Sequence, residues 1–144
     1  MTSLRQLIEN SPSRFADSVR ESEGTLLELE AALNVSLPLD VRWFWQFCGS
    51  GDTDAAPNAR CSISDTIRFR SAVSLPSNYV VLDDRNDGGT VFLDTDSAAG
   101  EVIWVDYHAV EKIGLGKMLP TEHDLFPTFA DWVGFCIEQA SDAA

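Results

Sequence analysis

The stretch YVVLDDRNDGGTVFLDTD, residues 79–96, decides the fold class, because it reads as two strands around a tight turn. The runs YVVLD (79–83) and TVFLD (90–94) are dense in β-branched and aromatic residues, which favour extended backbone. The linker RNDGG (85–89) contains asparagine, aspartate and glycine, which tolerate the positive φ of close turns. So short a connection leaves no room for a crossover helix, and an antiparallel hairpin is predicted.

Two further runs have strand-like composition, TIRFRSAV (66–73) and EVIWVDY (101–107), and both are predicted to be strands. In 101–107 both alternating sets of side chains are largely apolar, which is typical of an interior strand covered on both faces. Residues 49–64 are rich in Gly, Asp, Ala and Pro and are predicted to form a loop. The sheet is therefore expected to be antiparallel.

Helices are predicted on the N-terminal side of the sheet. Ser3 is placed to cap a short helix, which SPS (11–13) interrupts. The segment TLLE (25–28) fits a capping box at the start of a second helix. A third helix begins near Pro38, carries apolar side chains over more than half its circumference, and ends at the glycines of GSGD (49–52).

A last amphipathic helix is predicted over residues 128–139. Thr128 and Asp131 have capping-box spacing, and apolar residues follow at helical intervals. Trp132 in this helix and Trp104 in the interior strand are expected to be buried core residues. Truncation of either to alanine is expected to cost about 3–5 kcal/mol.

The order of these elements gives an α+β fold in a single domain: N-terminal helices, a central antiparallel sheet and a closing C-terminal helix. A length of 144 residues suits one domain with a sizeable core. We assign residues 1–24 to an N-terminal extension with a short helix and residues 25–140 to the folded domain.

The net charge of the chain limits the classes of partner that it can bind. Ten Lys and Arg against 23 Asp and Glu give a net charge of −13. A field of this sign repels nucleic acid and anionic membrane surfaces, and it accelerates the encounter with a basic partner. Acidity that only keeps the protein in solution is the alternative explanation.

The compartment is predicted to be the cytoplasm. No apolar run approaches the ~18 residues of a membrane span, and the N-terminus lacks the basic lead and apolar block of a secretory signal. Cys48, Cys61 and Cys136 are far apart in the sequence and contain no CxxC pair, which favours reduced thiols.

The aspartates of the hairpin do not fit a calcium loop. With Asp84 as the first position, Asn86 suits the third, but Gly88 and Thr95 stand where ligand oxygens from an acid or amide are needed. His108 and His123, the only histidines, lack metal-ligand spacing. No metal site is predicted.

No catalytic or cofactor-binding motif is recognisable either. The chain has no GxSxG turn, and GLGK (114–117) lacks the upstream glycine and the Ser or Thr of a P-loop. A pair of carboxylates for glycoside hydrolysis stays open, because their separation is set only in three dimensions. No catalytic residue and no cofactor is predicted.

One pattern along the chain resembles the SUKH superfamily, which includes bacterial immunity proteins of the Smi/Knr type and fungal cell-wall-assembly regulators. The segments that carry it are ALNVSLPLDVRWFWQFCGSGD (32–52), VFLDTDSAAGEVIWVDY (91–107) and FPTFADWV (126–133). The likeness covers residues 23–138. It departs from the family at Cys48-Gly49, where many members have Asn-Gly after the second helix.

The resemblance implies a non-catalytic cytosolic immunity protein that binds and neutralises a cognate toxin of an interbacterial competition system. Many such toxins are nucleases with basic surfaces, which an acidic protein suits. An intracellular regulator or scaffold with the same fold is the second hypothesis, and an enzyme is the third. The oligomeric state and the toxin are left open.

Under this hypothesis the hairpin acids form part of a docking surface. With Arg85 alone opposing them, residues 83–106 have a net charge of −6. Solvation of strand ends is the simpler explanation of the same residues. Trp43, at the edge of the wide apolar arc of its helix, is a further candidate contact. The candidate acids are Asp83, Asp84, Asp87, Asp94, Asp96, Glu101 and Asp106.

Overall fold

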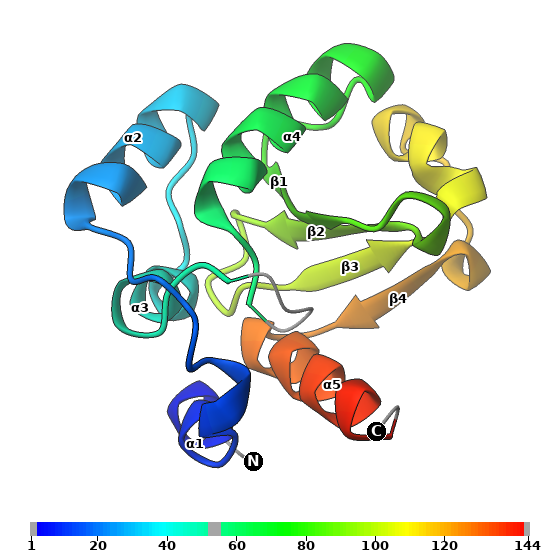
Figure 1. The fold of residues 1–144 in the computed structure, drawn as a ribbon. Helices are drawn as coiled ribbons and strands as arrows, with labels where there is room; N and C mark the ends of the chain where they lie inside the picture. The colour runs from blue at the N-terminus through cyan, green and yellow to red at the C-terminus, as the bar shows by residue number, and fades with distance from the viewer. Residues whose placement is uncertain (1–2, 52–55, 143–144) are drawn as a thin grey trace.

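The computed structural model describes residues 3–51 and 56–142, and Figure 1 shows its helices and strands. Residues 52–55 of the predicted loop 49–64 lie outside the described residues, as do residues 1–2 of the N-terminal extension. The elements in chain order are α1 (Leu4–Glu9), η1 (Pro12–Arg14), α2 (Glu23–Leu33), α3 (Leu39–Phe47), α4 (Ala59–Val73), β1 (Tyr79–Asp84), η2 (Asn86–Gly88), β2 (Thr90–Asp94), β3 (Val102–Val105), η3 (Tyr107–Leu115), η4 (Pro120–Glu122), β4 (His123–Phe126) and α5 (Phe129–Asp142).

The sheet is antiparallel throughout, with the strands in the order β1-β2-β3-β4 (Figure 1). This confirms the predicted hairpin, in which Val80 pairs with Leu93, and the predicted interior strand, since β3 lies between β2 and β4. The fourth strand, β4, was not expected from the sequence. Its residues HDLF contain only two apolar side chains, too few for a strand pattern.

The turn between β1 and β2 has the backbone that its residues predict. Asn86 has a φ of +54° and Gly89 a φ of +92°. At Gly89 a Cβ atom would also lie 2.3 Å from the carbonyl oxygen of Val105 on β3. Only glycine fits this position, because both the left-handed backbone and the close approach exclude a side chain.

The prediction of a strand at 66–73 is wrong, and so is the prediction of a loop for 59–64. Both segments belong to α4, whose first turn is capped by Asn58: its Oδ1 accepts hydrogen bonds from the main-chain nitrogens of Arg60 (3.0 Å) and Cys61 (3.1 Å). The buried residues Ala59, Ser62, Thr66 and Phe69 recur at intervals of three and four, which is the helical period.

The alternation that suggested a strand there was a coincidence of Arg68 and Arg70 with apolar neighbours. Ile67, which the strand pattern would bury with Phe69, is 51% exposed.

The helix starts follow the sequence in part. Ser3 forms the expected cap of α1 together with Gln6. The predicted box at Thr25 and Glu28 is wrong, because α2 begins one turn earlier, where Ser22 Oγ accepts a hydrogen bond from the main-chain nitrogen of Thr25. Before α5, Thr128 Oγ1 accepts from the main-chain nitrogen of Asp131 at 3.0 Å, as its spacing predicts.

Each face of the sheet is covered by its own hydrophobic cluster. One cluster joins residues of α1, α2, α3 and α5 to the face that carries Val102. The other joins α4 and η3 to the face that carries Ile103 and Val105. Trp132 of α5 is fully buried in the first cluster, which confirms its predicted place in the core.

The three cysteines are free thiols, as predicted: Cys48 and Cys136 are buried and Cys61 is exposed. Burial raises the pKa of the Cys48 thiol to about 11, against the opposing effects of a hydrogen bond with Ser18 and the charge of Arg20. None of the helices within the described ranges has the length and hydropathy needed to cross a lipid bilayer.

Candidate functional site

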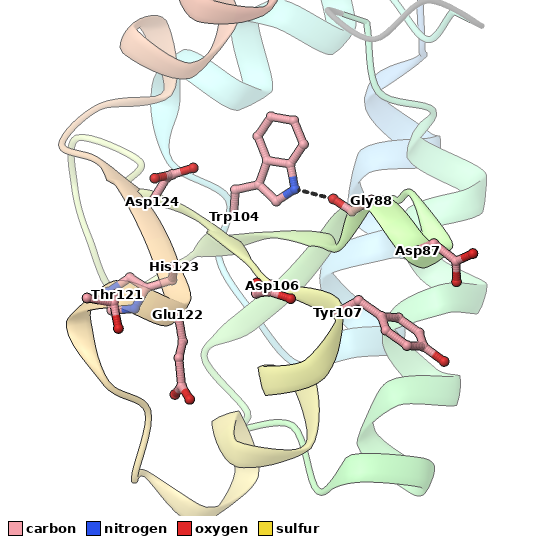
Figure 2. A pocket seen from close by; sticks show the side chains of 9 residues that line it. All are labelled: Asp87, Gly88, Trp104, Asp106, Tyr107, Thr121, Glu122, His123 and Asp124. Atoms are coloured by element: carbon pink, nitrogen blue, oxygen red, sulfur yellow. Dashed lines mark hydrogen bonds between the residues drawn. The ribbon is translucent and has the colours of Figure 1, made fainter.

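A groove of about 290 Å³ lies at the end of the sheet where the β1–β2 turn, the end of β3 and the start of β4 meet. Figure 2 shows side chains from these elements and from η3 and η4 around it. Carboxylates dominate the polar groups at its edge. The lining residues are Asp87, Gly88, Trp104, Asp106, Tyr107, Thr121, Glu122, His123 and Asp124.

Trp104 forms part of the wall of the groove. Its indole Nε1 donates a hydrogen bond to the carbonyl oxygen of Gly88 at 2.8 Å (Figure 2). The guanidinium of Arg85 lies 4.3 Å from the centre of the indole ring, and Phe135 of α5 meets the ring edge-on at 6.0 Å. The prediction of a buried core position for Trp104 is therefore wrong, since the side chain is half-buried and borders the groove.

Three groove carboxylates have no ion-pair partner within the described chain: Asp87, Asp106 and Asp124, all exposed. The carboxylate of Asp106 accepts a hydrogen bond from the main-chain nitrogen of His108 at 3.1 Å and so caps η3. No ion pair within the described residues offsets their charges, so the groove favours cations.

The fourth carboxylate, Glu122, is paired with Lys112, whose Nζ lies 2.5 Å from Oε1. The hydrogen bond from Lys112, followed by that from the main-chain nitrogen of Leu119, lowers the pKa of Glu122. This group therefore stays ionised at neutral pH, but most of its charge is offset.

The structure separates the acids that the sequence analysis grouped together. Asp83 pairs with Arg85 at 2.7 Å, and Asp84 pairs with Arg68 at 2.7 Å. The carboxylate of Asp84 also accepts a hydrogen bond from the main-chain nitrogen of Asn86, which fixes the start of the turn. These two acids are held in ion pairs and contribute less free charge than the sequence suggests.

Asp94, Asp96 and Glu101 lie at the other end of the sheet, because the register places Asp94 beside Tyr79 and Thr90 beside Asp84. The length of β2 separates the two ends by roughly 13 Å. The carboxylate of Asp94 accepts hydrogen bonds from Asn78 Nδ2 and the main-chain nitrogen of Asp96, each at 2.9 Å, so it holds a turn.

Of the predicted site acids, the groove thus brings together only Asp87 and Asp106. Their neighbour Asp124 was missed, because it lies on β4, the strand that the sequence did not predict. The acids of TEHD (121–124) were visible only as a polar loop, and nothing in their spacing connects them to residue 87.

Trp43 lies in a different place, on α3. Its ring stacks on Phe47 at 5.8 Å, and the guanidinium of Arg5 lies 5.0 Å from its centre. A second groove of about 600 Å³ adjoins it, between α1, α3 and the start of α5. Leu39, at the start of the same helix, is 80% exposed, so this surface is apolar rather than acidic.

No group of three or more His, Cys, Asp or Glu side chains among the described residues is arranged to hold a metal ion.

Comparison with known proteins identifies the family. The family model described as SMI1 / KNR4 family (SUKH-1) matches residues 21–134, about four-fifths of the chain, and this confirms the resemblance found in the sequence. No curated protein matches the chain.

Proposed function

Since the chain belongs to the SMI1 / KNR4 family (SUKH-1), we propose that it is a non-catalytic immunity protein of the cytoplasm, which binds and neutralises a cognate toxin of an interbacterial competition system. Membership of this family is consistent with an immunity-type protein and with the binding of a protein partner. The toxin is expected to present a basic surface.

The observation that carries the proposal is the groove with three unpaired carboxylates. Asp87, Asp106 and Asp124 come from three different elements, yet they border one groove beside Trp104. Lysine and arginine side chains fit such a place, because the carboxylates offset their charge and the indole provides apolar contact for their methylene groups.

Inhibition would follow from competition for a surface. A toxin that acts on nucleic acid needs exposed cations to hold phosphates. If the carboxylates of the groove pair with those cations, the toxin loses access to its substrate while its fold stays intact. Long-range attraction between the acidic protein and the basic toxin also speeds their association.

The test compares two variants with the same change in net charge. The groove variant is Asp87→Asn, Asp106→Asn and Asp124→Asn; asparagine keeps the capping ability of Asp106. The control variant is Glu28→Gln, Asp96→Asn and Glu138→Gln, at exposed positions outside the groove. If a toxin gene adjoins the gene of this protein, the rate of association with its toxin domain is measured by stopped flow, together with protection of cells that express this toxin.

The groove variant is expected to associate about tenfold more slowly than the control and to protect poorly. Equal rates for the two variants would show that the groove is not the docking site. Failure of the unmodified protein to protect cells from the toxin would reject the immunity function and favour a regulator or scaffold.

A further inference from the structure

The strand β4 forms one edge of the sheet (Figure 1). The hydrogen bonds of the β3–β4 ladder determine which of its main-chain groups face outward. The main-chain nitrogen of Asp106 donates to the carbonyl oxygen of Glu122 at 2.8 Å, just beyond the start of β4. Hydrogen-bonded pairs alternate along an antiparallel ladder, so the pairs of Trp104 with Asp124 and of Val102 with Phe126 are the next two. The N–H and C=O groups of His123 and Leu125 therefore point away from the sheet.

The opposite edge of the sheet is closed by a helix. On β1 the outward N–H of Val81 donates to Thr66 Oγ1 of α4 at 2.9 Å, and both residues are buried. Nothing comparable is found on β4: within the described residues, no hydrogen bond reaches the outward main-chain groups of His123 or Leu125. The Leu125 side chain is 54% exposed. A free strand edge of this kind can accept another strand.

The side chains at this edge determine which kind of strand can pair with β4. Asp124 shares a sheet face with its partner Trp104 and borders the acidic groove, whereas Leu125 lies on the other face and does not line the groove. A fifth strand would place the residue opposite Asp124 beside the groove carboxylates and the residue opposite Leu125 against an exposed apolar side chain.

We propose that β4 is a docking edge for an extended segment of the partner protein, in which basic and apolar residues alternate and which adds to the sheet as an antiparallel fifth strand. The proposal rests on the proposed function and deepens it. The apolar residues of the segment would form the main-chain hydrogen bonds with His123 and Leu125, and its basic residues would enter the groove.

A second copy of the chain fits the edge poorly. Antiparallel pairing of two β4 strands through these outward groups would set His123 of one copy opposite Leu125 of the other. The two Asp124 side chains would then lie directly opposite each other, beside the carboxylates of both grooves. Like charges at such positions oppose pairing, and each copy carries a net charge of −13. Charge thus selects a basic segment over self-association.

The first experiment uses the full chain and a short, end-blocked peptide of alternating lysine and valine as the probe. We expect binding by calorimetry at low ionic strength, and no binding of the matched peptide of glutamate and valine. Methylation of the main-chain nitrogens of the valines removes the N–H groups that donate to β4 and is expected to weaken binding about tenfold or more. Methylation of the main-chain nitrogens of the lysines is expected to leave the affinity nearly unchanged. Hydrogen exchange of the His123 and Leu125 amides is expected to slow in the complex.

Absence of binding to the lysine–valine peptide, or equal effects of the two N-methylated forms, would overturn the proposal. Sedimentation tests for self-association. If the chain forms oligomers that the peptide dissociates, the proposal is also overturned, since the edge would then bind a second copy.

A matched pair of variants tests the edge in the protein itself. Leu125→Pro removes an outward N–H that the sheet does not use, so folding is retained, and peptide binding is expected to fall about tenfold. Leu125→Ala keeps the N–H and is expected to bind several-fold more tightly than Leu125→Pro. Equal affinities of the two variants for the peptide would contradict a main-chain contact. Circular dichroism checks that Leu125→Pro is folded. If this variant does not fold, the comparison of the two N-methylated peptides tests the main-chain contact instead.

The two proposals fail in distinguishable ways. If the toxin binds the protein, and Leu125→Pro binds it as tightly as Leu125→Ala, the proposed function stands and the docking edge is rejected. If no toxin binds but the lysine–valine peptide does so with the expected dependence on N-methylation, the edge is real and the immunity function is rejected.

Discussion

Single residues set the shape of the groove, and Gly89 is the one with the least freedom. Its positive φ and its contact with the Val105 carbonyl hold the turn against the end of β3. We expect Gly89→Ala to destabilise the protein by about 1–3 kcal/mol or more, measured by urea denaturation.

The neighbouring glycine is the control for this prediction. At Gly88 a Cβ would only approach the Cβ of Arg85 at 3.3 Å, and its φ is not in the left-handed region. Gly88→Ala is therefore expected to cost much less than Gly89→Ala. A similar loss for both variants would mean that crowding in the turn, rather than backbone conformation, determines the cost.

Cys48 is expected to make the stability of the protein depend on pH in the alkaline range. Its thiol has a pKa of about 11 in the folded state, above the ordinary value of 9.0, so the unfolded chain loses the proton first. The contribution of the protonated Cys48 thiol to the free energy of unfolding is therefore complete below pH 9 and is lost as the pH rises toward 11. We expect the difference in unfolding free energy between the unmodified protein and Cys48→Ala to shrink by roughly 1 kcal/mol or more over this range. A constant difference would show that the folded thiol ionises normally.

At the scale of elements, α4 is the part that the sequence pattern misassigned, and Asn58 is the residue on which its start depends. Asn58→Ala leaves the first main-chain nitrogens of the helix without their acceptor and is expected to cost about 0.5–2 kcal/mol, measured by thermal or chemical denaturation. Asn58→Asp keeps an acceptor and is expected to be close to neutral. Equal stability of Asn58→Ala and Asn58→Asp would contradict the capping role.

The elements that the sequence predicted correctly are those whose pattern reflects their own burial. The hairpin, β3 and α5 bury regular sets of side chains, so local periodicity identifies them. In α4 only one narrow face is buried, and Arg68 and Arg70 imitate a strand alternation. In β4 two of four residues are exposed, so pairing with β3 rather than composition makes it a strand.

The same reason explains what was missed at the site. Asp87 and Asp106 were candidates from the sequence because they follow predicted strands, whereas the place of Asp124 beside them depends on the pairing of β4. The seven acids do not lie together in the structure, because sequence proximity does not tell which end of a strand a residue occupies. Their pairing with Arg68 and Arg85 is likewise a tertiary fact.

For the whole molecule, the acids of the sheet lie at two ends roughly 13 Å apart, within a net charge of −13 that is spread over the whole chain. At ~0.15 M salt the Debye length is about 8 Å, so a partner at the groove is attracted mainly by the near end; at ~0.01 M it is about 30 Å, and both ends contribute. We expect association with the proposed toxin to accelerate steeply as salt is lowered.

The control variant of Glu28, Asp96 and Glu138 is expected to associate as fast as the unmodified protein at physiological salt and more slowly only at low salt. The groove variant is expected to be slower at both. If the control variant is equally slow at physiological salt, attraction comes from the total charge and the groove has no special part in it.

The position of Trp104 means that the groove contains its own optical reporter. Trp45 and Trp132 are fully buried and provide a constant emission background, whereas the indole of Trp104 borders the groove under the guanidinium of Arg85. Replacing Trp43, which lies beside another groove, by phenylalanine leaves Trp104 as the single indole whose surroundings change when the acidic groove is filled. Binding can then be followed as a shift in emission maximum, in unlabelled protein and at concentrations far below those of calorimetry.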